Sequence, residues 1–322
     1  MSVRGGGRVR LLAGVLLGAL AMLGLAACDD IAMAGACGQG GPINSHVKRP
    51  ALIFACSAAN VDGQPYYQLW RLLPHGARRL SSVPAQDPAV APSGSRLAYE
   101  STASGMPEID VSDLRLASPH AVATAPGGQS EPAWSRDGTR LAYVSGQLGL
   151  HTGVGVSNSF GTIFVSSAEG GGPRQVTPDD AFYGEPAWSP DGNRIAYATD
   201  RDGYWAIYTT SLTGGAKPRM LTMAGEAQWP TWSPDGTQIA YQYSRTLGGE
   251  DSIWVMGANG GGDPRYLTSG SRPTWSPDGK WIAFVRKTDQ GSDLWMISPH
   301  PGAHAIRLTD DPGLKGRLTW VQ

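Results

Sequence analysis

Acidic residues that stand directly before a proline are the first candidates for chemistry in this sequence. Asp87, Glu131 and Glu185 occupy this place in three successive copies of a repeated motif. Two carboxyl groups held a few ångströms apart can serve as general acid and as nucleophile or base in glycoside hydrolysis. A carbohydrate-active or hydrolytic enzyme that uses these acids is therefore one hypothesis, to be weighed against a binding role.

Other catalytic constellations are absent from the sequence. No Gly-x-Ser-x-Gly nucleophile elbow occurs, and we expect no α/β-hydrolase domain. The six histidines are scattered, without Cys or His partners at the spacing of zinc ligands. We therefore expect no cofactor and no metal, and we do not expect an enzyme.

A repeat of about 44 residues positions the candidate residues. Glu185-Pro-Ala-Trp-Ser-Pro-Asp-Gly192 matches Trp229-Pro-Thr-Trp-Ser-Pro-Asp-Gly236, and other copies follow the same pattern. An aspartate or a tryptophan that recurs in nearly every copy indicates a scaffold role rather than catalysis. The tryptophan place of the motif falls at Val90, Trp134, Trp188, Trp232, Trp275 and Trp320.

Each repeat is expected to form four short strands. Ser-Pro-Asp-Gly suits a type I turn followed by a glycine with positive φ. In the segment 194–199, the large Ile195 and Tyr197 alternate with Ala196 and Ala198, so both faces are apolar and one of them is small. Sheets buried on both faces, at this repeat length, are typical of propeller blades.

The phase of the repeats gives the number of blades. The chain enters the pattern at a second strand, in residues 51–56, and ends on a first strand that contains Trp320. We therefore predict an all-β, six-bladed β-propeller of four-stranded antiparallel blades over residues 51–322. The C-terminal strand should complete the N-terminal blade, which removes an exposed sheet edge. A closed ring also favours a monomer.

The Pro-x-Trp-Ser-Pro-Asp-Gly runs, the Ile-Ala-Tyr/Phe triplets and the Leu-Thr pairs that end most units resemble the WD40-like repeats of TolB-type propellers, also called PD40 repeats. The resemblance covers about residues 51–322. It implies the propeller fold, and such propellers occur in binding proteins, in peptidases and in some lyases. It also implies an envelope role, although we expect a lipid-anchored tether where TolB has an α/β domain.

The N-terminus resembles a bacterial lipoprotein signal. Three arginines precede an apolar stretch that ends Leu25-Ala26-Ala27-Cys28, so residues 1–27 are expected to be a signal peptide and Cys28 the lipidated residue. An ordinary signal peptide, or a retained membrane helix, is the alternative. Residues 28–50 are expected to form a flexible tether. The protein is then exported and anchored to the bacterial cell membrane, facing the periplasm or the exterior.

Two cysteines remain after Cys28. Cys37 and Cys56 could form a disulfide that ties the tether to the propeller, since exported proteins meet an oxidising compartment. Alternatively, Cys56 is a small buried residue in an apolar strand. The sequence leaves both possibilities open.

The binding hypothesis places the partner where the blades differ. The longest hairpins, 57–66 and 145–161, fall on the rim that also holds the connections between blades, and the second contains His151. Extra length on one face of a rigid scaffold favours a binding face. The residues before each proline, or its equivalent, should stand at the channel mouth on this rim: Asp87, Glu131, Glu185, Trp229, Arg272 and Arg317.

The net charge of the chain argues against nucleic acid as a partner. The formal net charge is −1, and charged residues make up only 16% of the chain, so no basic surface for nucleic acid is indicated. We therefore favour a non-catalytic, membrane-tethered envelope module that binds a protein or peptide at the channel-mouth rim. These three acids, one aromatic and two bases would bind a charged or amphipathic segment of the partner. Alternatively, they are solvated residues at the starts of strands.

Overall fold

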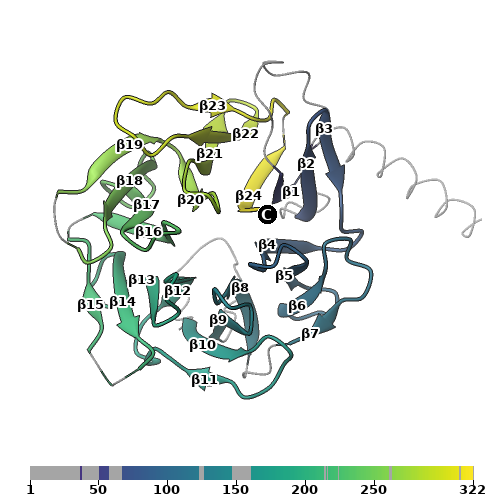
Figure 1. The fold of residues 1–322 in the computed structure, drawn as a ribbon, viewed down its shortest axis with the longest axis horizontal. Helices are drawn as coiled ribbons and strands as arrows, with labels where there is room; N and C mark the ends of the chain where they lie inside the picture. Colours follow the sequence, from purple (N-terminus) through teal and green to yellow (C-terminus); the bar gives the residue numbers. More distant parts are fainter. Residues whose placement is uncertain are drawn as a thin grey trace, which may run out of the picture.

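The computed structural model describes residues 37, 51–57, 67–122, 127–146, 161–213, 215, 217–223, 225–260, 263–311 and 313–321. Within them, six four-stranded antiparallel sheets are arranged around a central axis (Figure 1). The fold is the six-bladed propeller that the repeats predict.

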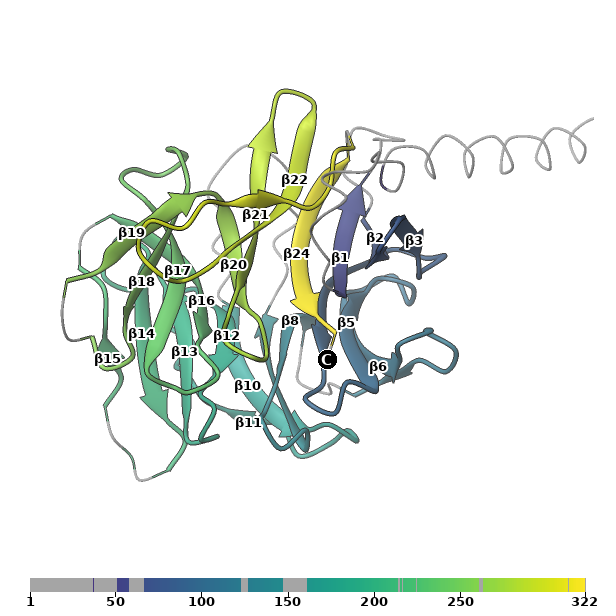
Figure 2. The ribbon, with the colours of Figure 1, turned by 45° about the horizontal axis from the view of Figure 1, so that its top comes forward.

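One blade joins the two ends of the propeller. Its strands, from the axis outward, are β24 (Leu314–Trp320), β1 (Leu52–Ser57), β2 (Gln68–Leu73) and β3 (Gly76–Arg79). Leu52 pairs with Trp320 in the β1–β24 ladder, and Figure 2 shows the two strands side by side. The predicted closure by the C-terminal strand is confirmed.

The other five blades follow in chain order, each with its first strand at the axis. Their strands are β4 (Ala85–Val90), β5 (Arg96–Ser101), β6 (Glu108–Asp113) and β7 (His120–Ala121); β8 (Gly128–Trp134), β9 (Arg140–Gly146), β10 (Gly161–Ser167) and β11 (Arg174–Gln175); β12 (Tyr183–Trp188), β13 (Arg194–Thr199), β14 (Ala206–Ser211) and β15 (Arg219–Met220); β16 (Glu226–Trp232), β17 (Gln238–Ser244), β18 (Ser252–Gly257) and β19 (Arg265–Ser269); β20 (Ser271–Trp275), β21 (Ile282–Thr288), β22 (Gly291–Ile297) and β23 (Ile306–Arg307).

The hydrophobic core is divided among the interfaces between adjacent blades. On β13, Ile195 and Tyr197 pack toward the blade before, whereas Ala196 and Ala198 pack toward the blade after. The alternation of large and small residues thus lets each sheet bury both faces, as predicted.

Tryptophans also link neighbouring blades by hydrogen bonds. The indole Nε1 of Trp134 donates to the carbonyl oxygen of Ala89 at 2.8 Å, and that of Trp188 donates to Ala133 at 3.1 Å. Trp320 makes the equivalent bond to Thr274 at 3.0 Å, across the closing interface. The recurrent tryptophans therefore belong to the interblade scaffold.

The Ser-Pro-Asp-Gly segments form the predicted turns. In one copy the amide of Gly138 donates to the carbonyl of Ser135 at 2.9 Å, and Gly138 has a φ of 68°. The Asp137 carboxylate accepts hydrogen bonds from the Ser135 hydroxyl and the Thr139 amide, at 2.6 and 3.0 Å. The recurrent aspartates thus hold their own turns together.

These turns and the interblade connections define two opposite rims of the propeller. We call the turn rim the one formed by residues 91–95, 135–139, 189–193, 233–237 and 276–280. We call the connection rim the one formed by residues 81–84, 102–107, 200–205, 221–223, 245–251 and 309–311.

Candidate site at the propeller axis

The axis-lining strands share a bulge at the position of the candidate site residues. The β4–β5 ladder shifts register between Gln86 and Ala89, and the same shift occurs in β8, β12, β16 and β20. The β24–β1 ladder shifts between Phe54 and Cys56, opposite the segment that contains Arg317. A bulge re-aims the side chain that it carries.

Five residues at these bulges have a left-handed backbone. Non-glycine residues in this region are uncommon and cost about 1–3 kcal/mol each, and they gather at functional sites. Five in one ring indicate a backbone that the surrounding blades impose. Their φ angles are 49° at Asp87, 56° at Glu131, 58° at Glu185, 55° at Trp229 and 51° at Arg272.

Two of the acids bind the backbone of the next blade. The Glu131 carboxylate accepts a hydrogen bond from the amide of Glu185, and the Glu185 carboxylate accepts one from the amide of Trp229. Glu185 is only 7% exposed. These carboxylates therefore stabilise the bulged ring, which the sequence did not indicate.

The aromatic and the two bases form the other half of the ring. The guanidinium carbon of Arg272 lies 5.1 Å from the centre of the Trp229 ring, and that of Arg317 lies 5.6 Å from it. Both distances are within the range of a cation–π interaction. The structure thus brings the six sequence-selected residues together.

Burial raises the pKa values of the ring acids. The pKa of Glu131 rises to about 7, chiefly through burial and then through the nearby charge of Asp87, while Arg317 and Arg272 oppose the rise. The pKa of Glu185 lies well above its usual 4.5, first because of burial and then because of Glu131. Burial also raises the pKa of Asp87.

Sequence reasoning missed Glu100 as a member of this cluster. Glu100 is buried on β5, accepts a hydrogen bond from the Gln86 amide at 2.8 Å, and has a pKa raised to about 8 by burial and by Asp87. The signal was present: the residue after the second-strand aromatic is apolar in most blades, but it is Glu100 here and Gln242 in another. Gln242 accepts the Arg272 amide at 3.2 Å.

A cavity of about 270 Å³ lies along the axis. Four of the six ring residues line it: Glu185, Trp229, Arg272 and Arg317. The rest of the lining runs down to residues of the turn rim, including Pro92, Pro190, Pro234 and Pro277. No sequence feature indicated a cavity on this side of the polar ring.

Exposed apolar side chains favour the connection rim. Val83, Met106, Met223, Leu247 and Leu314 are large hydrophobic residues that are exposed there or at the adjoining start of β24. Met223 and Leu247 are 79% and 80% exposed. Among the described residues, the other two exposed large hydrophobics are Leu73 and Tyr266, on β2 and β19. Isolated exposed hydrophobics are ordinary, but their concentration on one rim indicates a contact surface.

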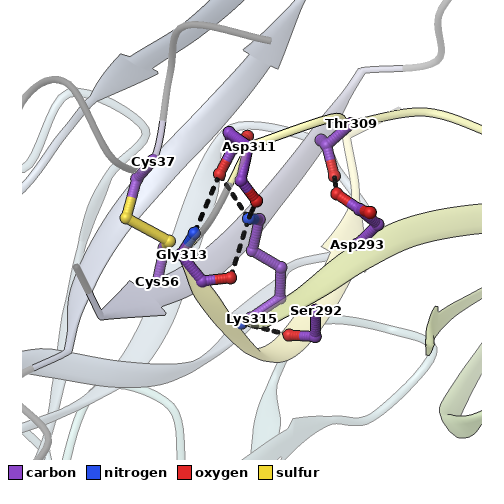
Figure 3. The surroundings of a disulfide bond; sticks show 8 residues. All are labelled: Cys37, Cys56, Ser292, Asp293, Thr309, Asp311, Gly313 and Lys315. Carbon is purple, nitrogen blue, oxygen red and sulfur yellow. Dashed lines mark hydrogen bonds and ion pairs between the residues drawn. A yellow bond between two sulfur atoms is a disulfide. The ribbon is translucent and has the colours of Figure 1, made fainter. Parts of the chain in front are cut away.

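A disulfide and a buried ion pair lie near the joint between the last and first blades (Figure 3). Cys37 is bonded to Cys56, the penultimate residue of β1. The Lys315 ammonium forms an ion pair with Asp311, and both side chains are almost wholly buried. The ammonium also donates to the carbonyl of Gly313 at 3.0 Å. Cys28 and His151 lie outside the described residues.

No group of three or more His, Cys, Asp or Glu side chains in the described residues could hold a metal ion. Likewise, the described part of the chain contains no helix with the length and apolar character needed to cross a bilayer.

The solved structures show the same fold in proteins of several kinds. TolB from Acinetobacter baumannii superposes with a TM-score of 0.69 over 85% of this chain and 67% of that chain, at 21% sequence identity. Hydrazine synthase from Kuenenia stuttgartiensis gives a TM-score of 0.67 over 88% of this chain and 47% of that chain, at 14% identity.

Curated relatives are matched over part of their length. The Tol-Pal system protein TolB of Bordetella pertussis is 32% identical over 172 residues, which are 53% of this chain and 35% of that protein. The uncharacterized peptidase YuxL of Bacillus subtilis is 33% identical over 93 residues, 29% of this chain and 14% of that protein. The chain therefore spans about a third or less of each. A family model, the TolB beta propeller domain PD40, matches residues 77–321. The chain belongs to the PD40 family of TolB β-propeller domains.

Proposed function

We propose that this chain is a non-catalytic, membrane-tethered envelope module that binds a protein or peptide at the channel-mouth rim. The observation that carries the proposal is the concentration of exposed apolar side chains on the connection rim, around an axis ringed by charged residues. An apolar surface with polar and charged neighbours is the usual composition of a protein interface.

Family membership supports a partner in the cell envelope. The Bordetella relative is named a Tol-Pal system protein. By analogy, the partner of this chain would be an envelope protein, and the propeller would act as a monomer. The match covers only 35% of that relative, so its partners come to this chain as part of the proposal.

The tether forms the second half of the proposal. Cleavage before Cys28 and lipidation of its thiol would hold the chain at a membrane surface, facing the periplasm or the exterior. Several acyl chains contribute about 0.8 kcal/mol per buried CH₂, which suffices for stable anchoring. The Cys37–Cys56 disulfide would then fix where the tether of residues 28–50 meets the propeller.

A matched pair of leucines allows a direct test of the rim. A photo-crosslinking amino acid at Leu247, on the connection rim, should capture an envelope protein in membranes, and mass spectrometry would identify it. The same substitution at Leu73, at the end of β2 on the opposite side, is the control. Capture from position 73 alone, or equally from both, would refute the rim assignment.

A substitution series adds a second readout. In the chain that carries the crosslinking residue at position 247, Met223→Asp and Met106→Asp should abolish the crosslink while the melting temperature stays unchanged, because both side chains are exposed. Reversing the charge of Glu131 or Glu185 would be a poor test, since their carboxylates bind backbone amides of the ring.

The enzymatic alternative rests on the carboxylates at the axis. The pKa of Glu131, raised to about 7 by burial, suits a general acid near neutral pH. However, its carboxylate already accepts the Glu185 amide, which favours a structural role. Turnover of an envelope polysaccharide by the purified chain, lost in Glu131→Gln or Glu185→Gln, would support an enzyme.

A further inference from the structure

The axial cavity differs in position and chemistry from the rim proposed for the protein partner. It runs from the polar ring toward the turn rim, and prolines such as Pro132, Pro186 and Pro230 contribute to its wall. Its volume of about 270 Å³ is many times the ~10–15 Å³ that a single water molecule needs. The space therefore suits a small organic ligand or a few residues of a peptide.

The end of this cavity at the polar ring carries two guanidinium groups. Arg272 and Arg317 line the cavity together with Trp229, over whose ring both groups lie. Neither side chain forms an ion pair or a side-chain hydrogen bond with another residue in the described part of the chain. By contrast, Arg307 forms an ion pair with Asp293 at 2.5 Å.

Arg317 also has a donor without a partner among the residues that the structure describes. Its Nη1 atom is buried and has no hydrogen-bond partner among the described residues. Buried polar groups are nearly always paired, so the Arg317 guanidinium is left with unused hydrogen-bonding capacity.

The acids of the ring lie near these guanidinium groups, which oppose the rise in their pKa values, but only one of the acids reaches the cavity. Asp87 and Glu131 do not line it, whereas Glu185 does. Burial raises the pKa of Glu185 well above its usual value, and the charge of Glu131 adds to the rise. Its oxygen is already an acceptor for the Trp229 amide. This end of the cavity is therefore lined by two guanidinium groups and an indole, beside one carboxyl group.

We propose that the axial cavity binds an organic carboxylate with an apolar or aromatic body. The carboxylate would accept hydrogen bonds from Arg317 and Arg272, whose planar forks match its two oxygens. The body would lie against the prolines and indoles of the wall. Such a carboxylate could belong to a small free acid or to the C-terminus of a peptide. The site shares Trp229, Arg272 and Arg317 with the polar ring but extends from the ring toward the turn rim, and the proposal does not depend on the function proposed above.

Calorimetric titration of the purified full-length chain tests the carboxylate. Phenylacetate should bind, and phenylacetamide, which has the same body without the charge, should bind at least about tenfold more weakly. The peptide Ala-Ala-Phe with a free C-terminus, compared with its amide, tests the second source. Tighter binding of the free peptide than of phenylacetate assigns the site to a chain terminus, and the reverse assigns it to a small acid.

Variants assign the binding to the two arginines. Arg317→Gln should weaken binding of the carboxylate by about tenfold or more, and Arg272→Lys should weaken it less because the charge stays. Lys280→Gln is the matched control: it removes one positive charge from the turn rim, and Lys280 does not line the cavity. Melting curves verify that each variant is folded.

Three results would overturn the proposal. These are equal binding of acid and amide, undetectable binding of both acids to the folded chain at millimolar concentration, and unchanged binding in a folded Arg317→Gln variant. A failure here leaves the crosslinking test at Leu247 untouched, so the two proposals are distinguished.

Discussion

Leu52 and Trp320 face each other across the ladder that joins the first described strand to the last. The indole of Trp320 also donates to Thr274 of the preceding blade at 3.0 Å. On the other side, the hydroxyl of Thr319 accepts the Val90 amide of the following blade at 3.3 Å. The C-terminal strand is thus bonded to three blades, and ring closure depends on it.

Deletion of residues 318–322 should therefore destabilise the propeller strongly. Leu318 and Trp320 are both buried, and loss of each large core side chain costs about 2–5 kcal/mol. We expect a loss of about 5 kcal/mol or more in the free energy of unfolding, measured by denaturant titration. Leu247→Ala, at an exposed position, should change it little. A truncated chain as stable as the full one would contradict the closure.

Gly270 determines how β20 enters the ring ahead of Arg272. An added Cβ would lie 2.5 Å from the Phe284 ring and 2.8 Å from the Val285 carbonyl oxygen, and the φ of 142° is itself unfavourable for other residues. We expect Gly270→Ala to lower the free energy of unfolding by about 3 kcal/mol. Because β20 must shift, this variant should also bind any ligand that contacts Arg272 more weakly.

Gly171→Ala provides the matched control for Gly270→Ala. Gly171 has a φ of 83°, but a Cβ there would meet no atom within 4 Å. It should show only the cost of a left-handed backbone, about 1 kcal/mol. Equal effects of the two substitutions in denaturant titrations would show that the contact of an added Cβ at Gly270 with its neighbours does not lower the free energy of unfolding.

The repeat pattern was sufficient to predict the blades and their closure. The second-strand aromatics directly face the third-strand positions that the pattern selected, as Phe54 faces Trp70 and Phe284 faces Trp295. Even Tyr99 faces Asp110, where the pattern is broken. Because side chains alternate with a period of two along each strand and the repeat length is nearly constant, few strand registers bury the apolar residues of such a sheet.

The backbone of the axial ring could not be predicted in the same way. Glu185, Trp229 and Arg272 have no intrinsic preference for the left-handed region, and the neighbouring blades impose it. For the same reason, the contact of both Arg272 and Arg317 with Trp229 had no signal in the sequence. Such contacts depend on how side chains from distant repeats meet at the axis.

Removal of the disulfide should weaken the first blade. Cys37 and Cys56 are 19 residues apart in the sequence. A disulfide that closes a loop of this length contributes about 2–4 kcal/mol to the free energy of unfolding. Cys37→Ala should therefore unfold at lower denaturant concentration than the parent chain under non-reducing conditions. With a reductant present, the two chains should differ little. Two reactive thiols at these positions in the denatured, unreduced parent chain would refute the disulfide.

The pH dependence of stability should separate the axial acids from the turn aspartates. The pKa of Glu131 rises from its usual 4.5 to about 7 on folding, mainly through burial, so between these values the folded chain holds a proton that the unfolded chain has released. Stability should therefore fall as the pH rises from about 4.5 to 7. Glu131→Gln, which keeps an acceptor oxygen without the charge, should flatten this part of the profile.

Asp137→Asn is the control of opposite sign. Hydrogen bonds from Ser135 and Thr139 lower the pKa of Asp137 from 3.8 to about 2. Its contribution to stability is therefore complete above pH 3.8 and is lost as the pH falls through about 2. Melting temperatures measured between pH 2 and 8 should show the Asp137→Asn deficit at neutral pH and its disappearance in acid, whereas the Glu131→Gln difference should grow only above about pH 4.5. If the two variants gave parallel profiles, burial of Glu131 at the axis would not be the cause of its raised pKa.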